Sequence, residues 1–216
     1  MTRTLLLMLA ALATAQDAKP DRWEADIQAF EKKDKENPPP QGEIVFAGSS
    51  TMRMWKTAES FPDLKVINRG FGGSQMADSV KYADRIILPY KPRIVVVYAG
   101  SNDLASGKTP EKVLEDWEAL VKKIHGALPK TRILFIGTKP TIRRWAMIDR
   151  QKKMNELLAA QVKGDKRLGF IETGAAFLGD DGKPRADLLL KDGLHLNPDG
   201  YKVLAGIVRP YLVGEK

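Results

Sequence analysis

Five short apolar runs, rich in β-branched residues, alternate along this chain with longer stretches of helical periodicity. The runs are EIVFAG, LKVINRG, RIVVVYAG, RILFIGT and LGFIET, at residues 43–48, 64–70, 93–100, 132–138 and 168–173. They are apolar almost throughout rather than at every second position, which is typical of strands buried on both faces. Strands that alternate with helices predict an α/β protein with a mostly parallel sheet, covered by helices on both sides in a three-layer α/β/α sandwich.

The stretches between the runs carry apolar residues at helical spacing. Candidate helices cover residues 21–36, 76–88, 111–128, 147–162 and, near the end, 198–208. The clearest is 111–128, where four apolar side chains share one face, namely Val113, Trp117, Leu120 and Ile124. After the first candidate, NPPPQG at 37–42 stops the helix, because consecutive prolines cannot continue one. We therefore expect an N-terminal helix and Pro-rich linker at 16–42 and one α/β domain at 43–216.

The first fifteen residues have the pattern of a secretory signal peptide. Arg3 precedes an apolar run from Leu5 to Ala13, and Ala13-Thr14-Ala15 forms a small-x-small cleavage signal. A buried helix or a membrane anchor is the alternative, but the run is shorter than the roughly 20 residues that span a bilayer. We expect cleavage after Ala15 and a mature protein without a membrane span, exported to the periplasm or beyond the cell. The chain has no cysteine, so it forms neither disulfides nor thiolate metal sites.

The charge balance is basic, with 35 Lys and Arg against 27 Asp and Glu, a formal net charge of +8. The two signs are interleaved, as in EKKDKE and EKVLEDWEALVKK, which is typical of solvated helix faces. No basic stripe or recognition motif accompanies the charge. Nucleic acid is therefore not an expected partner.

Polar and glycine-rich segments follow the predicted strands at the edge where open parallel sheets bind ligands. Gly48–Ser50 follow the first run, NRGFGGS (68–74) the second and GSND (100–103) the third, while DGLHLNPDGY (192–201) follows the fifth. Together they supply a hydroxyl, glycine amides, a side-chain amide and an Asp-x-x-His pair, which is the equipment for acyl transfer. Each piece alone is weak, because a serine after a strand is more often a helix N-cap. The residues alone do not choose between Ser49 and Ser50.

In this order, the four segments resemble the blocks of the SGNH (GDSL-type) serine hydrolase family. The match covers most of the chain after the signal peptide and implies a five-stranded, flavodoxin-like sheet. FAGSSTMRMW resembles the first block, with Ser49 where the family usually has aspartate. The resemblance implies a catalytic triad of Ser50, Asp192 and His195, and an oxyanion hole formed by the backbone N–H groups of Ser50 and Gly73 and the side chain of Asn102.

The remaining candidates are weaker. The chain has two histidines, and His125 lies near the end of the 111–128 helix, where a surface or capping role is expected. Asp187 and Asp199 lack the Asp-x-x-His spacing. With His195 assigned as base, no zinc site is expected, and no cofactor.

The loop TKPTIRRWAMIDR (138–150) follows the fourth run at the same edge. Trp145 could form a wall of the substrate pocket, and Arg143 or Arg144 could meet an anionic leaving group. An ordinary surface loop is an equally good interpretation. Trp55 is expected to pack rather than to contact substrate.

We therefore expect an exported serine ester hydrolase that acts on small-molecule or polysaccharide acyl esters, such as O-acetyl groups on carbohydrate or lipid. Lysophospholipase or thioesterase activity is the alternative within the family. A non-catalytic carbohydrate-binding domain is the alternative outside enzymes. The sequence does not give the oligomeric state.

Overall fold

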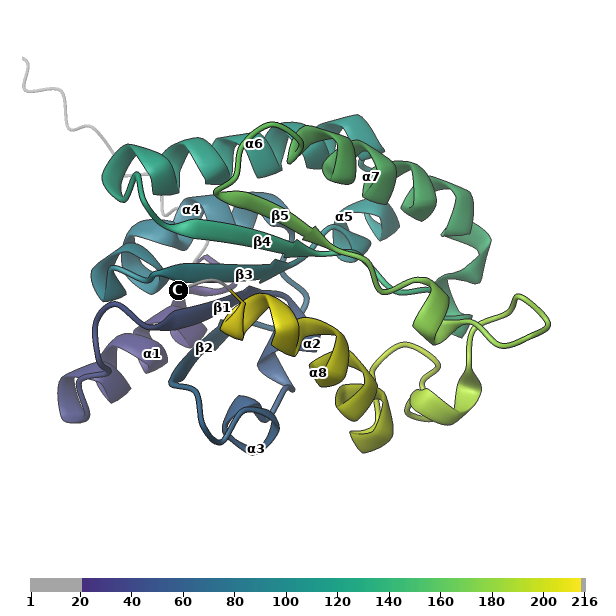
Figure 1. Cartoon of the computed structure of the whole chain (residues 1–216), viewed down its shortest axis with the longest axis horizontal. Helices are drawn as coiled ribbons and strands as arrows, with labels where there is room; N and C mark the ends of the chain where they lie inside the picture. The colour runs from purple at the N-terminus through teal and green to yellow at the C-terminus, as the bar shows by residue number, and fades with distance from the viewer. Residues whose placement is uncertain (1–20, 215–216) are drawn as a thin grey trace, which may run out of the picture.

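The computed structural model describes residues 21–214 and has a single sheet of five parallel strands between layers of helices (Figure 1). The strands are β1 (Ile44–Gly48), β2 (Val66–Gly70), β3 (Ile94–Tyr98), β4 (Arg132–Ile136) and β5 (Leu168–Ile171). Their order is β2-β1-β3-β4-β5, and all four pairings are parallel. The predicted α/β sandwich with a flavodoxin-like sheet is confirmed. The predicted signal peptide, residues 1–15, lies outside the described residues.

The α-helices of this part of the chain are α1 (Glu24–Glu36), α2 (Ser50–Arg53), α3 (Thr57–Ser60), α4 (Met76–Ile86), α5 (Ser101–Ala105), α6 (Pro110–Ala127), α7 (Ile148–Gln161) and α8 (Pro198–Val213). Four short 3₁₀ helices join them: η1 (Leu88–Tyr90), η2 (Ile142–Met147), η3 (Ala175–Phe177) and η4 (Ala186–Leu188). In Figure 1, α6 and α7 lie on one side of the sheet and α8 on the other.

Each face of the sheet has its own apolar core, because side chains of a strand point alternately to opposite faces. Val45 and Ala47 of β1 belong to the core under α1, α4, α6 and α7. Ile44 and Phe46 belong to the core under α8 and the α2–α3 segment. Strands buried on both faces explain why the five runs are apolar throughout.

Helix α1 packs into the first of these cores. Ile27 is fully buried there, and the Trp23 ring meets Phe71 edge-on at 5.7 Å between ring centres. Arg85 of α4 forms ion pairs with Glu24 and Glu31 on the outside of the contact. The predicted boundary at residue 43 therefore separates segments along the chain but not two cores.

The predicted helix bounds are close except at the C-terminal helix, which continues to Val213 instead of ending near 208. Pro210 inside α8 has no N–H to donate, yet the helix continues past it, and Leu212 in the last turn is buried against the second core. Trp55 is buried as predicted, with its ring 5.3 Å from Phe46. No helix within residues 21–214 has the length and apolarity to cross a membrane.

Candidate active site

The turn after β1 sets the position of Ser50. Gly48 has φ +126°, and a Cβ there would lie 2.1 Å from the carbonyl oxygen of Tyr98, so only glycine fits. The Ser49 N–H donates to that same oxygen at 3.0 Å, and Ser50 opens α2 immediately afterwards. Ser49 occupies the N-cap position but makes no capping hydrogen bond with its side chain. The turn therefore depends on backbone contacts with β3 rather than on a serine cap.

Ser50, His195 and Asp192 lie in a hydrogen-bonded row. Ser50 Oγ is 3.0 Å from His195 Nε2, and His195 Nδ1 is 2.6 Å from Asp192 Oδ2. A carboxylate only accepts, so the contact at Nδ1 places the ring proton on that nitrogen. Nε2 is then free to accept a proton from the serine hydroxyl.

The loop that carries Asp192 and His195 is fixed by its own backbone. Asp192 Oδ1 accepts from the N–H groups of Leu194 at 2.9 Å and His195 at 3.0 Å. Gly193 between them has φ +64°, and its carbonyl accepts from the Arg143 N–H at 2.9 Å. The His195 N–H and imidazole, which both donate to the Asp192 carboxylate, hold the pKa of that carboxyl down at about 2. Asp192 is therefore ionised at neutral pH.

Asn102 lies beside the row in a fixed orientation. Its Oδ1 accepts from Arg144 Nη2 at 2.7 Å, and its Nδ2 donates to the Ser74 carbonyl at 2.9 Å. A guanidinium can only donate, so the oxygen of the amide must face Arg144. One Nδ2–H remains for another acceptor.

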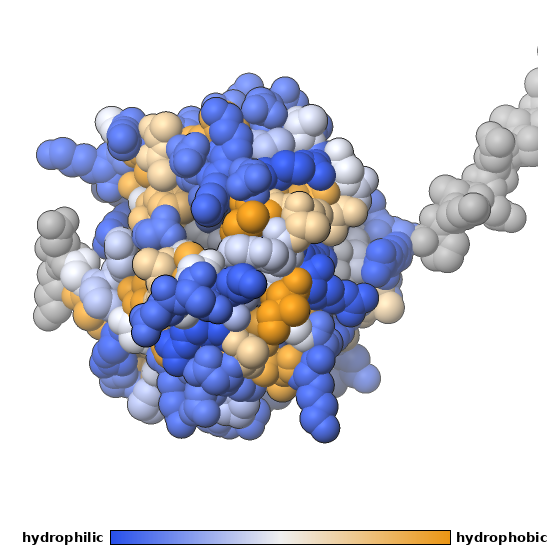
Figure 2. All heavy atoms as spheres, turned by 90° about the vertical axis from the view of Figure 1, so that its right-hand side faces the viewer, coloured by the Kyte–Doolittle hydropathy of each residue, from blue (hydrophilic) through white to orange (hydrophobic). Residues whose placement is uncertain are grey.

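A small cavity of about 20 Å³ lies against Ser50 and His195. Asn102 and Arg144 line it, together with Tyr98, Lys139 and Thr141. This edge of the sheet faces the viewer in Figure 2, where a largely hydrophilic surface carries separate hydrophobic patches. The space is about that of one water molecule.

Besides Asp192, which is linked to the cavity through His195, two predicted site residues are not among those that line it. Gly73 lies on the turn after β2 with φ +79°, close to Arg22 and Trp23. Trp145, on η2, is half-buried. Their predicted roles in the oxyanion hole and the substrate pocket stay predictions.

Lys139 is a cavity residue that the sequence did not single out. It is only 3% exposed, and its Nζ lies 3.3 Å from the hydroxyl of Tyr98. Arg144, which the sequence suggested together with the exposed Arg143, bonds to the carbonyl and hydroxyl of Ser101 and to Asn102. Burial lowers the pKa of the Arg144 guanidinium. In the sequence, the one indication that Lys139 and Arg144 lie at the site is their position in the loop after the fourth apolar run.

The rival titratable groups have other partners. His125 Nε2 lies 3.0 Å from the Thr131 carbonyl, which belongs to the segment between α6 and β4 and not to the end of α6. Asp187 pairs with Arg185, and Asp199 pairs with Lys202. Within residues 21–214 there is no group of three or more His, Asp or Glu side chains placed to hold a metal ion.

The site holds a hydroxyl, an imidazole and a carboxylate in a row, with a side-chain amide beside them. This arrangement is suited to acyl transfer. Residues 47–203 match the model of the GDSL-like Lipase/Acylhydrolase family. The chain belongs to this family, which confirms the resemblance seen in the four sequence blocks, and it is a hydrolase of the acylhydrolase and esterase class.

Individual relatives agree with this assignment. Platelet-activating factor acetylhydrolase IB subunit alpha1 from Bos taurus is 29% identical over 196 residues, which cover 86% of this chain and 81% of the relative. A GDSL-like lipase from Bacteroides thetaiotaomicron shares the fold with a TM-score of 0.73 at 18% identity, over 87% of this chain and 97% of the other. An acetyl-xylooligosaccharide esterase from Geobacillus Stearmophilus also shares the fold, with a TM-score of 0.65 at 17% identity. The similarity covers 82% of this chain and 96% of the esterase.

The depressed pKa of Asp192 predicts a pH-dependent contribution to stability. The carboxylate is more acidic in the folded protein, so its contribution is present above the ordinary value of 3.8 and is lost as the pH falls towards about 2. The difference in thermal unfolding temperature between the wild type and Asp192→Asn should therefore be largest above pH 4 and shrink towards pH 2. Circular dichroism measures the unfolding temperatures of the wild type and of the variant. Asp199→Asn, which removes an exposed pair, should show little difference at any pH. A difference for Asp192→Asn that does not change with pH would contradict the expectation.

Proposed function

We propose that the protein is an exported serine ester hydrolase that cleaves small acyl esters, such as O-acetyl groups on carbohydrate or lipid, through an acyl-enzyme on Ser50. The observation that carries the proposal is the hydrogen-bonded row from Ser50 through His195 to Asp192, at 3.0 and 2.6 Å. Export rests on the signal-peptide pattern of residues 1–15. Cleavage after Ala15 requires the mature chain to begin at Gln16, so an intact Met1 on N-terminal sequencing would refute the cleavage. Absence of the protein from both periplasm and culture medium would refute export.

In the first half of the reaction, Ser50 Oγ attacks the ester carbonyl while His195 Nε2 takes the hydroxyl proton. Asp192 keeps the imidazole oriented and stabilises the imidazolium. The tetrahedral intermediate then collapses, and His195 gives its proton to the leaving alcohol oxygen. The alcohol departs, and the acyl group stays on Ser50 as an ester.

In the second half, water attacks the acyl-enzyme with His195 as general base. Collapse of the second tetrahedral intermediate returns the proton to Ser50 Oγ and releases the carboxylic acid. In both tetrahedral intermediates the negatively charged oxygen needs hydrogen-bond donors. The free Nδ2–H of Asn102 and the backbone N–H groups of Ser50 and Gly73 are the proposed set.

The enclosed space beside Ser50 supports a small acyl group. It measures about 20 Å³, about that of one water molecule, so it takes one small group at most and has no room for a chain. The names of two similar proteins point the same way, because one is an acetylhydrolase and the other an acetyl-xylooligosaccharide esterase.

Lysophospholipase or thioesterase activity is the second candidate, and a groove supports it. The groove, of about 660 Å³, lies between α3 with the residues before it and α8. Its lining includes the apolar side chains of Met54, Trp55, Leu190 and Leu196 as well as charged ones such as Lys56 and Glu59. An acyl-length series of 4-nitrophenyl esters separates the candidates. We expect kcat/KM to be highest for acetate and to fall at butyrate and beyond, whereas a maximum at eight or more carbons would favour the second candidate.

Replacement of Ser50 should abolish the reaction. Ser50→Ala is expected to lower kcat on a small acetyl ester by roughly 10⁴-fold or more, as loss of a triad nucleophile does in other hydrolases. A fluorophosphonate should label the wild type on Ser50, as mapped by mass spectrometry, and should not label the variant. Ser49→Ala is the matched control and should still be labelled. An adduct on Ser49 would move the nucleophile by one residue, and no adduct on folded protein would favour a non-catalytic binding domain.

Replacement of Asn102 should slow turnover without unfolding the protein. One oxyanion donor is typically worth about 2.7–4 kcal/mol of barrier, so Asn102→Ala should lower kcat by roughly a hundredfold or more. Ser101→Ala is the control, because it also removes a contact of Arg144 but leaves the amide donor in place. Steady-state kinetics with a thermal unfolding check on each variant measures the effect. An equal loss of kcat in Asn102→Ala and Ser101→Ala would assign the loss to the disturbed Arg144 and not to the missing amide donor.

A further inference from the structure

We propose that Lys139 and Arg144 form a binding site for an anionic group, a carboxylate or a phosphate, that the substrate carries close to its ester bond. This inference deepens the proposed function and rests on ester hydrolysis at Ser50. It concerns the cavity that the two cations share with Ser50 and His195, whose enclosed volume of about 20 Å³ is that of one water molecule and so admits a single oxygen of the anionic group.

Lys139 is buried without a compensating charge. Its side chain lines the cavity, and its ammonium has three donors, of which one reaches the Tyr98 hydroxyl at 3.3 Å. The ammonium also lies 5.3 Å from the centre of the Tyr98 ring. Removal of an ammonium from water is unfavourable unless charge and hydrogen bonds offset it. One neutral hydroxyl and one ring do so only in part.

Arg144 brings a second positive charge to the same cavity. Its bonds go to the carbonyl and hydroxyl of Ser101 and to the Asn102 amide, all of which are neutral. Within residues 21–214, no carboxylate lies within 4.0 Å of either Arg144 or Lys139. Lys108 shows the contrast, because it is partly buried and pairs with both Asp103 and Asp116.

A third observation also indicates a missing ligand. Thr141 is 3% exposed and lines the cavity, and its Oγ1 is a buried hydroxyl without a hydrogen-bond partner. Buried polar groups are normally paired, so the unpaired hydroxyl of a residue that lines the same cavity as the two cations supports a missing acceptor there. An anionic oxygen supplies the acceptor and the charge together.

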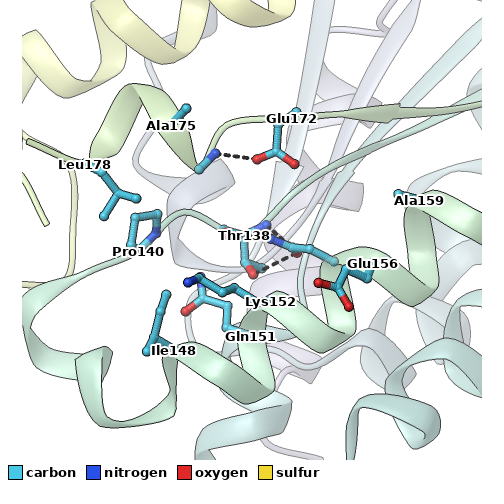
Figure 3. A pocket seen from close by; sticks show the side chains of 12 residues that line it. Thr138, Pro140, Ile148, Gln151, Lys152, Glu156, Ala159, Glu172, Ala175 and Leu178 are labelled. Carbon is cyan, nitrogen blue, oxygen red and sulfur yellow. Dashed lines mark hydrogen bonds between the residues drawn. The ribbon is translucent and has the colours of Figure 1, made fainter. Parts of the chain in front are cut away.

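The backbone at Lys139 is held firmly from the opposite side. Gln151 Nε2 of α7 donates to the Lys139 carbonyl at 2.6 Å, and Asn155 bonds to both the N–H and the carbonyl of Thr138 at 3.0 Å. Figure 3 shows Thr138 and Gln151 together where the strand end meets α7. Lys139 therefore does not leave the cavity through a mobile loop, and its burial is a built feature of the fold.

An anion there also suits the proposed chemistry. During turnover His195 becomes an imidazolium, and two further cations beside it would oppose that step by Coulomb repulsion. A negative group on the substrate offsets this repulsion and orients the ester. The negative charge can lie on the alcohol half or on the acyl half of the ester, and matched pairs of esters distinguish the two cases.

The test compares esters that differ by one charge. For the alcohol half, 3-acetoxybenzoate is paired with neutral 3-acetoxybenzamide, and for the acyl half, monomethyl succinate is paired with neutral methyl succinamate. The readout is the ratio of kcat/KM for the anionic ester to that for its neutral partner, with the Ser50→Ala rate subtracted. We expect one pair to favour the anion by about tenfold or more, which corresponds to about 1.4 kcal/mol.

Lys139→Met and Arg144→Met should each reduce that ratio towards one. The ratio is used because Arg144 also contacts Asn102, and an effect on the oxyanion donor cancels between the two esters. Lys153→Met is the matched control, because it removes the same charge from an exposed site on α7 and should leave the ratio unchanged. Equal rates on both pairs in the wild type, or a preference that survives Lys139→Met, would overturn the anion site while ester hydrolysis stands.

A binding measurement separates this inference from the proposed function. Inorganic phosphate should raise the thermal unfolding temperature of the Ser50→Ala protein, because a ligand of the folded state stabilises it. The rise should be lost on adding Lys139→Met and kept on adding Lys153→Met. If all four esters resist hydrolysis but phosphate acts in this way, the hydrolase proposal fails and the anion site remains. If the phosphate effect is the same with and without Lys139, the site fails.

Discussion

The parallel pairing of β1 with β2 on one side and β3 on the other is the constraint on which the candidate site depends. The register aligns Gly48 with Gly70 and with Tyr98, so the three strands end at one level. The loops that follow them then meet, and the Ser74 carbonyl accepts from the Asn102 side chain across two of them. Because a slip of one residue would turn every strand side chain to the other face, the two apolar cores hold this alignment.

The imidazole comes from outside the sheet and depends on a second constraint. Asp192 and His195 belong to one turn, so their geometry is local, whereas Ser50 and His195 lie 145 residues apart. Docking of α8 against α2 bridges that distance. The Tyr201 hydroxyl donates to the Thr51 carbonyl at 2.8 Å, directly after Ser50. The distance between hydroxyl and imidazole is thus set by the packing of the second core.

Structural features that follow from a local sequence pattern could be predicted from the sequence, whereas features that follow from tertiary packing could not. Apolar runs and glycines located the five strand ends, and from these the resemblance picked out Ser50, Asn102 and His195. The burial of Lys139 had no such signal, because a lysine in a polar loop is normally solvated. It is buried only because α7 holds its backbone and β3 places Tyr98 beside it. The continuation of α8 past Pro210 likewise follows from tertiary burial of its last turn.

The charges of the site are distributed unevenly, and this has a structural cause. Asp192 is the carboxylate of the row, but its oxygens are engaged by His195 and by the N–H groups of its own turn. It therefore pairs with the imidazole and forms no ion pair with Lys139 or Arg144. Arg144 in turn fixes the amide of Asn102 with one N–H available, which is the preorganisation that the proposed oxyanion hole requires. The two cations of the site therefore have no carboxylate partner of their own within residues 21–214, and they lie in the cavity where the proposed anionic group of the substrate would bind.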